Sequence, residues 1–448
     1  MRRIQRILIL IFFPIASFAA DKDLKLGLTE LIQRTLAHHP VIQEAKQRCE
    51  ESEARYAMAK SNLFPQLSLE ANVGTFHDRV ANPGEDVIPP VGRDRNRYVG
   101  KLILVQPIFH GFGLWNGIEM YKKKNAVVEA ALEKAKAQAL KEMLRAYFEV
   151  QVKRDEVQAR EEAKAFHENQ WKQTKMRFSQ GRATRLQLLE AEYVAGTEQP
   201  VIETLQGEIE NRILQMASSL DLQNPQLYQF SDSLEAAMGL LQESALPPAE
   251  EAVKALAAHS PQLHEARLQV EATEAEAALE LSEDLPSIDL YFSAGTDSYL
   301  RQDIATADTL FYSGEVRLKI PLFSGLSSLH KRRANRSLVN ARKKVQAKTE
   351  QDSLTTLLGA YHSWKVATTR IAVARKEVAF MEEKLSLTQK NLRAGRSTLS
   401  DVLEAYSELL DAKKKRGDAV IEKIMAVTDI RSLLGWFSHN QGKEVESD

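Results

Sequence analysis

The amino-acid sequence of this chain contains one long unit twice. The dipeptide at 39–40 (HP) recurs at 260–261 (SP), an offset of 221 residues, whereas residues 107–111 (PIFHG) recur at 321–325 (PLFSG), an offset of 214. The offset therefore changes once, by seven residues. Packed helices do not tolerate a slip of register, but a solvated loop tolerates a change of length. The repeat predicts two equivalent halves that differ most simply in one loop between strands.

Both halves have the same predicted order of elements: helix, strand, strand, helix, helix. The halves are residues 20–222 and 249–435, joined by an inter-repeat linker at 223–248 and followed by a tail at 436–448. Helices are expected at 28–62, 113–179, 184–222, 249–283, 326–393 and 399–435, and strands at 66–76, 97–106, 288–295 and 311–320. Prolines next to the strands mark the boundary between strands and helices: Pro65, Pro107, Pro286 and Pro321.

The predicted strands alternate between apolar and polar residues. In the third strand Ile288, Leu290, Phe292 and Ala294 oppose Asp289, Tyr291 and Ser293, and the fourth strand alternates in the same way. Strands of about ten residues with one apolar and one charged face are typical of an outer-membrane barrel wall. The alternative is a half-buried sheet in a soluble protein. That alternative needs a compact layer over the sheet, and the rest of the sequence offers none.

Four strands are too few to close a membrane barrel, since the smallest bacterial barrels have about eight. An open edge in lipid would leave backbone groups without hydrogen bonds. Several chains must therefore share one barrel. Two chains would give eight strands and three would give twelve, and the residues alone favour neither number.

The long helix of each half has about 68 residues, or roughly 100 Å at 1.5 Å per residue. In the second half, apolar residues in steps of four and three predict a coiled-coil seam: Ala367, Ile371, Ala374, Val378, Met381, Leu385, Thr388 and Leu392. The matching face of the first half is more polar and includes Val157, Lys164, His167 and Trp171. We therefore expect the two helical hairpins to have different surroundings.

Residues 1–19 have the pattern of a secretory signal peptide. Three arginines precede the apolar stretch at 7–15, and a small-x-small site at 17–19 predicts cleavage after Ala19. The alternative, a membrane anchor, would need about 20 apolar residues. The sole cysteine, Cys49, excludes an intrachain disulfide. The mature chain is thus expected to be exported.

Charge and motifs exclude several classes of function. The chain has a net charge of −1, and loss of the three leader arginines leaves 57 basic and 61 acidic residues, a net of −4. A nucleic-acid-binding domain would be strongly basic.

The sequence has no phosphate-binding loop, zinc-protease motif or cysteine cluster, so we expect no enzyme, no cofactor and no metal site. The basic run at 331–333 is either a solvated helix face or a contact for acidic lipid headgroups.

The most specific pattern occurs twice, at residues 177–192 and 391–406. In each segment a glycine (Gly181 or Gly395) is expected to stop one helix, and a threonine (Thr184 or Thr398) is expected to cap the next. One such pattern is weak evidence. Two of them, at equivalent places in a duplicated unit with boundary prolines, resemble the helical tips of the TolC-type outer-membrane efflux family. The resemblance extends over essentially the whole mature chain.

This resemblance implies a homotrimer, with a twelve-stranded barrel in the outer membrane of a Gram-negative bacterium and a long periplasmic α-helical coiled-coil tunnel. The fold class is therefore mostly α with a membrane β-barrel. The implied function is a passive exit duct for a tripartite efflux pump or a type I secretion system. The implied partners are outer-membrane lipid, a periplasmic adaptor and an inner-membrane transporter of the ABC, RND or MFS type.

The resemblance also implies roles for individual residues. The adaptor would contact the hairpin tips at Gly181, Arg182, Thr184, Gly395, Arg396 and Thr398. Asp401 and Glu404 match an acidic ring at the periplasmic aperture, where six carboxylates from three copies would favour cations. The alternative for these two acids is a solvated helix face. In the first half the equivalent positions are Gln187 and Glu190, so a ring there would be weaker.

Two other classes of protein remain open at this point. A periplasmic coiled-coil adaptor would have one hairpin and compact β domains rather than two equal units. A soluble structural coiled coil would not need strands with an apolar face. The tip positions that hold aromatic and arginine residues in well-known family members are Leu392 and Ser397 here, so the closed-state bonds of those members do not transfer.

Overall fold

The computed structural model describes residues 24–79, 92–220, 228–230, 239, 246–298 and 306–436. The predicted signal peptide, most of the predicted linker and residues 437–448 of the tail lie outside the described residues. The chain divides into two compact units. The hairpin unit contains residues 1–38, 143–242 and 384–414, and the sheet unit contains residues 39–142, 243–383 and 415–448.

The described elements follow the predicted order in both halves. The helices are α1 Leu28–His38, α2 Pro40–Ser61, α3 Gly113–Ser179, α4 Arg185–Ser219, α6 Ala249–His259, α7 Pro261–Ser282, α8 Ser327–Arg393 and α9 Leu399–Leu433. The strands are β1 Leu24–Leu26, β2 Gln66–Arg79, β3 Gly92–His110, β4 Tyr228–Phe230, β5 Ser287–Ser298 and β6 Leu310–Lys319. The mostly helical, duplicated fold class is confirmed.

The first helix of each half is broken, contrary to the prediction of one continuous helix. His39 and Ser260 have extended ψ angles of 126° and 120°, and the proline that follows each of them opens a new helix. The proline ring disfavours helical backbone at the preceding residue, whereas proline itself is accommodated in the first helical turn. The same sequence feature therefore produces the same break, between α1 and α2 and between α6 and α7.

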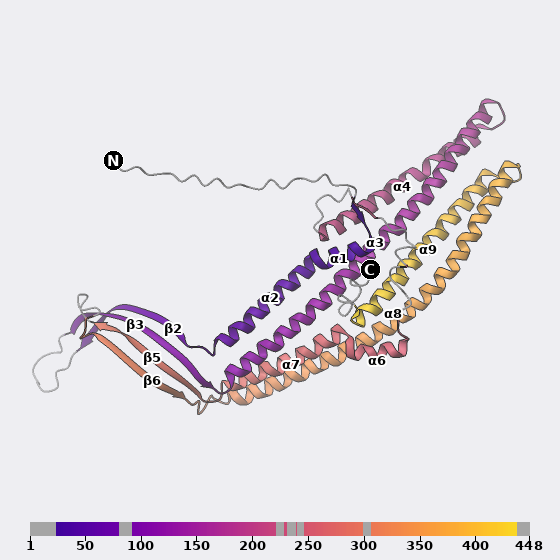
Figure 1. Cartoon of the computed structure of the whole chain (residues 1–448). Coiled ribbons are helices and arrows are strands. Elements are labelled where there is room, and N and C mark those ends of the chain that lie inside the picture. The colour runs from indigo at the N-terminus through magenta and orange to yellow at the C-terminus, as the bar shows by residue number, and fades with distance from the viewer. Residues whose placement is uncertain are drawn as a thin grey trace, which may run out of the picture. The chain divides into compact units, whose positions relative to one another are not determined.

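The sheet unit contains an antiparallel sheet of four strands in the order β2-β3-β5-β6 (Figure 1). Leu69 is opposite Leu102, Leu102 is opposite Ala294, and Ala294 is opposite Tyr312. Directly opposed residues of antiparallel strands share a face. The predicted apolar face is therefore confirmed, and it is bare: Leu69 is 72% exposed and Tyr312 is 91% exposed.

The opposite face of the sheet is polar and internally bonded. Lys101 forms an ion pair with Glu70 at 3.0 Å, and the guanidinium of Arg97 donates to Asp297 at 2.5 and 2.9 Å. Other contacts on this face join Ser293 to Ser313 at 2.8 Å and place the Arg317 guanidinium 3.7 Å from the ring centre of Tyr291. The sheet thus separates a polar network from an apolar surface with no covering layer among the described residues.

The outer strands β2 and β6 are hydrogen-bonded on one side only within the described part of the chain. Their other edges present unpaired backbone N–H and C=O groups. Natural proteins avoid long open edges of this kind, because such edges pair with another strand. The sheet can therefore accept a further strand at either edge.

The positions of the boundary prolines partly differ from the prediction. Pro65 and Pro286 directly precede β2 and β5, and Pro321 follows the end of β6. Pro107, however, lies inside β3, which continues to His110. Proline is tolerated there because β2 stops pairing at Val105 and the pairing with β5 is irregular between Pro107 and Phe109.

The strands of the two halves differ in length, whereas the predicted seven-residue difference in the loop falls on residues outside the described part of the chain. Strands β2 and β3 have 14 and 19 residues, whereas β5 and β6 have 12 and 10. The intervening loop residues 80–91 and 299–305 lie outside the described part of the chain. A hairpin lengthens by adding residues to both strands, which preserves the pairing and the alternation of faces.

Helical packing supplies the core of each unit. In the sheet unit a buried cluster joins α6, α8 and α9 through Ala252, Leu256, Leu357, Ala360, Ile430 and Leu433. In the hairpin unit β1 pairs with β4 in parallel, a contact that the sequence did not predict. None of the helices within the described ranges is apolar over a stretch long enough to cross a membrane.

Substitution by alanine should have opposite effects on stability at two glycines of the sheet, Gly295 and Gly100. A Cβ atom at Gly295 would lie 2.1 Å from the backbone oxygen of Gly100, whereas a Cβ at Gly100 would meet only a methyl group of Thr296 at 3.7 Å. Gly295→Ala must therefore separate β3 from β5, and we expect it to lower the unfolding free energy by about 1–3 kcal/mol. Gly100→Ala is the matched control and should be tolerated. Denaturant unfolding of both variants in detergent tests this, and equal stabilities would contradict the register.

Candidate functional site

The two helical hairpins of the hairpin unit end in the same glycine turn. At the first tip Gly181 has a φ of 70°, the amide of Arg182 donates to the Arg177 oxygen at 2.7 Å, and the amide of Gly181 donates to the Phe178 oxygen at 2.9 Å. This pair of bonds is a Schellman motif, which satisfies the last carbonyl groups of α3.

The second tip repeats this geometry. Gly395 has a φ of 69°, the amide of Arg396 donates to the Asn391 oxygen at 2.9 Å, and the amide of Gly395 donates to the Leu392 oxygen at 3.1 Å. A Cβ atom at either glycine would meet nothing within 4 Å. Glycine is therefore required for its left-handed backbone and not for lack of space.

A capping box opens each returning helix. At the start of α4 the Thr184 hydroxyl accepts from the Gln187 amide at 3.2 Å, and the Gln187 side chain accepts from the Thr184 amide at 2.9 Å. At the start of α9 the Thr398 hydroxyl accepts from the Asp401 amide at 3.2 Å, and the Asp401 carboxylate accepts from the Thr398 amide at 2.7 Å. Gln187 and Asp401 therefore occupy equivalent positions, 214 residues apart, and make the same bonds.

Asp401 has a local structural role that the sequence analysis missed. Its carboxylate also accepts a hydrogen bond from the Ser397 hydroxyl at 3.2 Å. The bond from the Thr398 backbone, followed by those from the Thr398 and Ser397 side chains, lowers the pKa of Asp401 below its ordinary value of 3.8. The signal in the sequence was the Thr-x-x-Asp spacing itself, which is the pattern of a capping box.

The structure places the predicted tip residues together at each hairpin end. Gly181, Arg182 and Thr184 are exposed at the first tip, and Gly395, Arg396 and Thr398 are exposed at the second. Asp401 and Glu404 are exposed and lie three residues apart at the start of α9, on one side of the helix. The tips thus offer unobstructed backbone turns and cationic side chains, and α9 begins with two acidic side chains.

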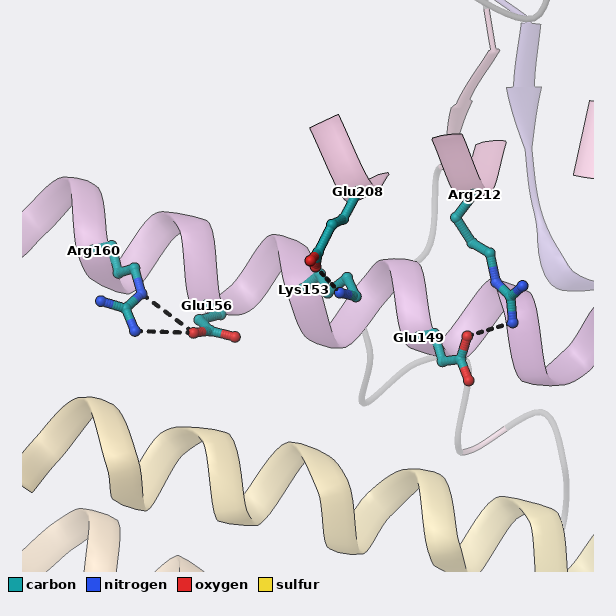
Figure 2. A network of polar contacts seen from close by, with 6 residues as sticks. All are labelled: Glu149, Lys153, Glu156, Arg160, Glu208 and Arg212. Carbon is teal, nitrogen blue, oxygen red and sulfur yellow. Dashed lines mark hydrogen bonds and ion pairs between the residues drawn. The ribbon is translucent and has the colours of Figure 1, made fainter. Parts of the chain in front are cut away.

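Ion pairs join the two helices of the first hairpin (Figure 2). The Arg212 guanidinium contacts Glu149 at 2.5 Å, and Lys153 contacts Glu208. Arg160 contacts Glu156 on its own helix at 3.1 Å and reaches Glu198 on α4 at 3.2 Å. Pairs of this kind are individually weak on a surface, but they favour one register of α3 against α4.

An aromatic cluster joins the two hairpins within the hairpin unit. The Tyr406 ring of α9 lies 5.1 Å from the Phe166 ring of α3 and 5.5 Å from the His167 ring. The Gln389 amide of α8 donates to the Tyr406 hydroxyl at 3.3 Å. His167 is only 5% exposed, and neither ring nitrogen has a hydrogen-bond partner within the described residues. Protonation of this ring would place an unpaired charge in an apolar contact.

The burial of the predicted seam agrees with an apolar stripe on α8. Ala367, Ile371, Ala374, Val378 and Leu385 are buried, whereas Met381, Thr388 and Leu392 are half-buried. On α3 the more polar counterparts Val157, Lys164 and Trp171 are half-buried as well, and His167 is buried. Among the described residues, no group of three or more His, Cys, Asp or Glu side chains is placed to hold a metal ion.

Comparison with known proteins identifies the class. The family described as "Outer membrane efflux protein" matches residues 31–220 and 252–435, one stretch in each half. These stretches amount to most of the chain, and the chain therefore belongs to this family. Each stretch covers one half of the internal duplication. The duplicated unit is therefore part of the sequence pattern that defines the family.

Individual relatives cover nearly the whole chain. The chain is 24% identical over 417 residues to the alkaline protease secretion protein AprF of Pseudomonas aeruginosa, across 92% of this chain and 84% of AprF. The Campylobacter jejuni CmeC outer membrane channel superposes with a TM-score of 0.76 at 13% identity, over 91% of this chain and 85% of that one. The open state of the Neisseria gonorrhoeae MtrE outer membrane channel gives 0.71 at 17% identity, over 94% and 93%. The fold is that of these channels.

We predict that the charge of Asp401 is dispensable for the turn but that its hydrogen bonds are not. Asp401→Ala removes the acceptor for the Thr398 amide, so hydrogen exchange of the Thr398 amide should accelerate. Asp401→Asn keeps an acceptor at the same place and should leave the exchange rate nearly unchanged. Acceleration in both variants would show that charge, and not the capping box, protects the tip.

We also predict a pH dependence from the buried histidine. Burial lowers the pKa of His167 from its ordinary value of 6.5, and Glu198 partly opposes this effect. The unfolded chain therefore takes up the proton first, so stability is complete above about pH 6.5 and decreases as the pH falls below it, by at most about 1.4 kcal/mol per pH unit. His167→Phe should reduce this slope in denaturant unfolding between pH 5 and 7.

His39 provides the control for this measurement. Burial lowers its pKa too, and Glu142 partly opposes the shift, but His39 belongs to the sheet unit. The His167→Phe variant should therefore keep the part of the slope that comes from His39. An unchanged slope in that variant would contradict the assignment to His167.

Proposed function

We propose that this protein is the outer-membrane exit duct of a tripartite efflux pump or a type I secretion system. Family membership and the shared channel fold support this function. The observation that carries the proposal is the four-stranded sheet, which has a bare apolar face, a bonded polar face and two open edges. A lipid-facing wall shared between chains requires all three features.

Closure of the sheet requires further copies of the chain. Within the proposal the free edge of β2 in one copy pairs with the free edge of β6 in the next. Three copies give a barrel of twelve strands, the number that the resemblance to the TolC-type family implies. The polar network of Arg97, Lys101, Asp297 and Arg317 then lines the interior, and the apolar residues face lipid.

The proposed partners meet the hairpin tips. The exposure of Gly181, Arg182 and Thr184, and of Gly395, Arg396 and Thr398, supports contact with a periplasmic adaptor. A passive duct has no energy source of its own. Within the proposal, an inner-membrane transporter of the ABC, RND or MFS type therefore supplies the energy. The name of the relative AprF, a protein of alkaline protease secretion, supports the secretion branch of this proposal.

The proposed aperture is acidic. In a trimer Asp401 and Glu404 would bring six carboxylates to one mouth, which would attract cations and hold back anions. Asp401 would then serve twice, as a cap for α9 and as a charge at the mouth. The alternative, two acids on a solvated helix face, predicts no effect on ion flow.

Fractionation of Gram-negative cells tests the proposal as a whole. We expect the mature chain, cleaved after Ala19, in the outer-membrane fraction, with gel migration that changes on heating because a trimer dissociates. A periplasmic adaptor would be released from this fraction or would remain tied to the inner membrane, and a structural coiled coil would partition into the aqueous phase. Either of those outcomes would contradict the proposal.

Single-channel recording in planar bilayers tests the acidic mouth. Asp401→Asn with Glu404→Gln removes the charges and keeps the capping box. At water-like dielectric each lost carboxylate weakens the binding of a blocking cation by about two- to fivefold, so block by multivalent cations should weaken. Glu190→Gln, at the position of the first half that matches Glu404, is the control with a smaller expected effect. Unchanged block in the double variant would remove these acids from the aperture.

A further inference from the structure

The junctions between strand and helix expose large apolar side chains at matching positions of both halves. We call these six residues the junction patch: Ile108, Phe112 and Trp115 in the first half, and Leu322, Leu326 and Leu329 in the second. Their exposed fractions are 54%, 60% and 63% in the first half and 91%, 60% and 62% in the second. Each pair is separated by the repeat offset of 214 residues. Exposure of three large apolar side chains at one site in both halves indicates a covering partner.

Backbone strain holds part of the junction patch outward. Phe112 and Leu326 both have a φ of 66°, and they are the only residues other than glycine with a positive φ in the described part of the chain. Each follows a glycine that also has a positive φ. A left-handed conformation is unfavourable for a bulky residue, because its Cβ atom approaches the following carbonyl oxygen. In both halves the backbone oxygen of this residue accepts a hydrogen bond from the first turn of the following helix, from the Asn116 amide at 2.9 Å and from the His330 amide at 3.3 Å, while its side chain remains exposed.

The junction patch continues the apolar face of the sheet. Along β6 and beyond it, Val316, Leu318, Ile320 and Leu322 are exposed at alternate positions, by 68%, 60%, 52% and 91%. In the first half the irregular pairing after Pro107 places Phe109 opposite Ile288, on the apolar face. The ring of Phe109 contacts the ring of Phe112 at 5.2 Å. The patch is therefore the helical border of the apolar face of the sheet.

Positive charge adjoins the junction patch at the start of α8. Lys331 is paired with Glu283 at 2.8 Å. Arg332, Arg333 and Arg336 are exposed, and no ion pair is formed by any of the three within the described ranges. Arg332 and Arg333 follow Leu329 by three and four residues, so the guanidinium groups lie beside the apolar side chain on one face of the helix.

We propose that the junction patch docks in the headgroup region of a bilayer leaflet, where Arg332, Arg333 and Arg336 bind the phosphates of anionic glycerophospholipids. Apolar and aromatic side chains next to arginine suit this boundary, because the rings enter the acyl edge and the planar guanidinium groups match phosphate. The inference rests on the proposed outer-membrane function. A second copy of the chain would satisfy the apolar residues but would leave the continuity with the lipid-facing surface and the row of unpaired arginines unexplained.

Fluorescence of Trp115 tests the position of the patch. A full-length variant with Trp171→Phe, Trp364→Phe and Trp436→Phe keeps Trp115 as its single tryptophan. In bilayers of phosphatidylcholine brominated on the acyl chain, Trp115 should be quenched, and more strongly by bromine near the headgroup end than by bromine near the tail. Protection of Trp115 from both bromine and aqueous iodide would mean that another copy covers the patch, and would overturn the inference.

A second tryptophan position separates this inference from the proposed function. In the same background, Trp115→Phe with Leu318→Trp moves the probe onto the apolar face of β6. Quenching at position 318 without quenching at position 115 would overturn the junction inference and leave the membrane sheet intact. Absence of lipid quenching at both positions would contradict the proposed function itself.

The arginines are tested by their preference for anionic lipid. Arg332→Gln, Arg333→Gln and Arg336→Gln together should reduce the apparent affinity for phosphatidylglycerol over phosphatidylcholine, by about fivefold for each arginine lost. The matched control is Arg342→Gln with Lys344→Gln and Lys348→Gln, which removes three exposed charges further along the same helix. An equal loss in both variants, or no loss in the first, would overturn the phosphate site.

Discussion

The backbone hydrogen-bonding groups along the outer edges of β2 and β6 constrain what this chain can be. Each edge has its partner strand on one side only within the described residues, and the face between the edges exposes Leu67, Leu69, Val73 and Val316 to solvent. A soluble protein would aggregate through such a sheet. In the proposed exit duct, lipid covers the apolar face and neighbouring copies pair with the edges. The apolar face and the open edges are therefore the two features of the single chain that the proposal of a shared channel explains.

The two halves of the duplicated sequence share local structural motifs as well as the order of helices and strands. Both halves break their first helix before a proline, end a long helix in a Schellman motif and open the next with a capping box. They also repeat the strained junction at Phe112 and Leu326. What differs is chemistry on the surface: Gln187 caps one hairpin and Asp401 caps the other, so only the second cap carries a charge.

The sequence was most informative where a feature is periodic or local. Alternation identified the four strands and the apolar face, and the glycine–threonine spacing identified both tips. Prediction failed where the deciding contact is distant in sequence. The pairing of β1 with β4 joins three-residue segments about 200 residues apart, which no local pattern marks. The contact of His167 with Tyr406 likewise depends on how two hairpins meet. The break before Pro40 and the cap by Asp401 differ from these cases, because both follow local rules: proline disfavours helical backbone at the preceding residue, and the Thr-x-x-Asp spacing is a capping pattern.

Disulfide formation between β2 and β6 tests most directly whether neighbouring copies close the sheet. In a Cys49→Ser background, cysteines would be introduced in pairs, such as Leu69→Cys with Tyr312→Cys or Leu67→Cys with Val316→Cys, to sample the register. Mild oxidation in membranes should give covalent dimers and trimers for one set of pairs, and no larger species. Chains that remain monomeric at every pair, or that cross-link only within themselves while the protein stays folded, would contradict the account.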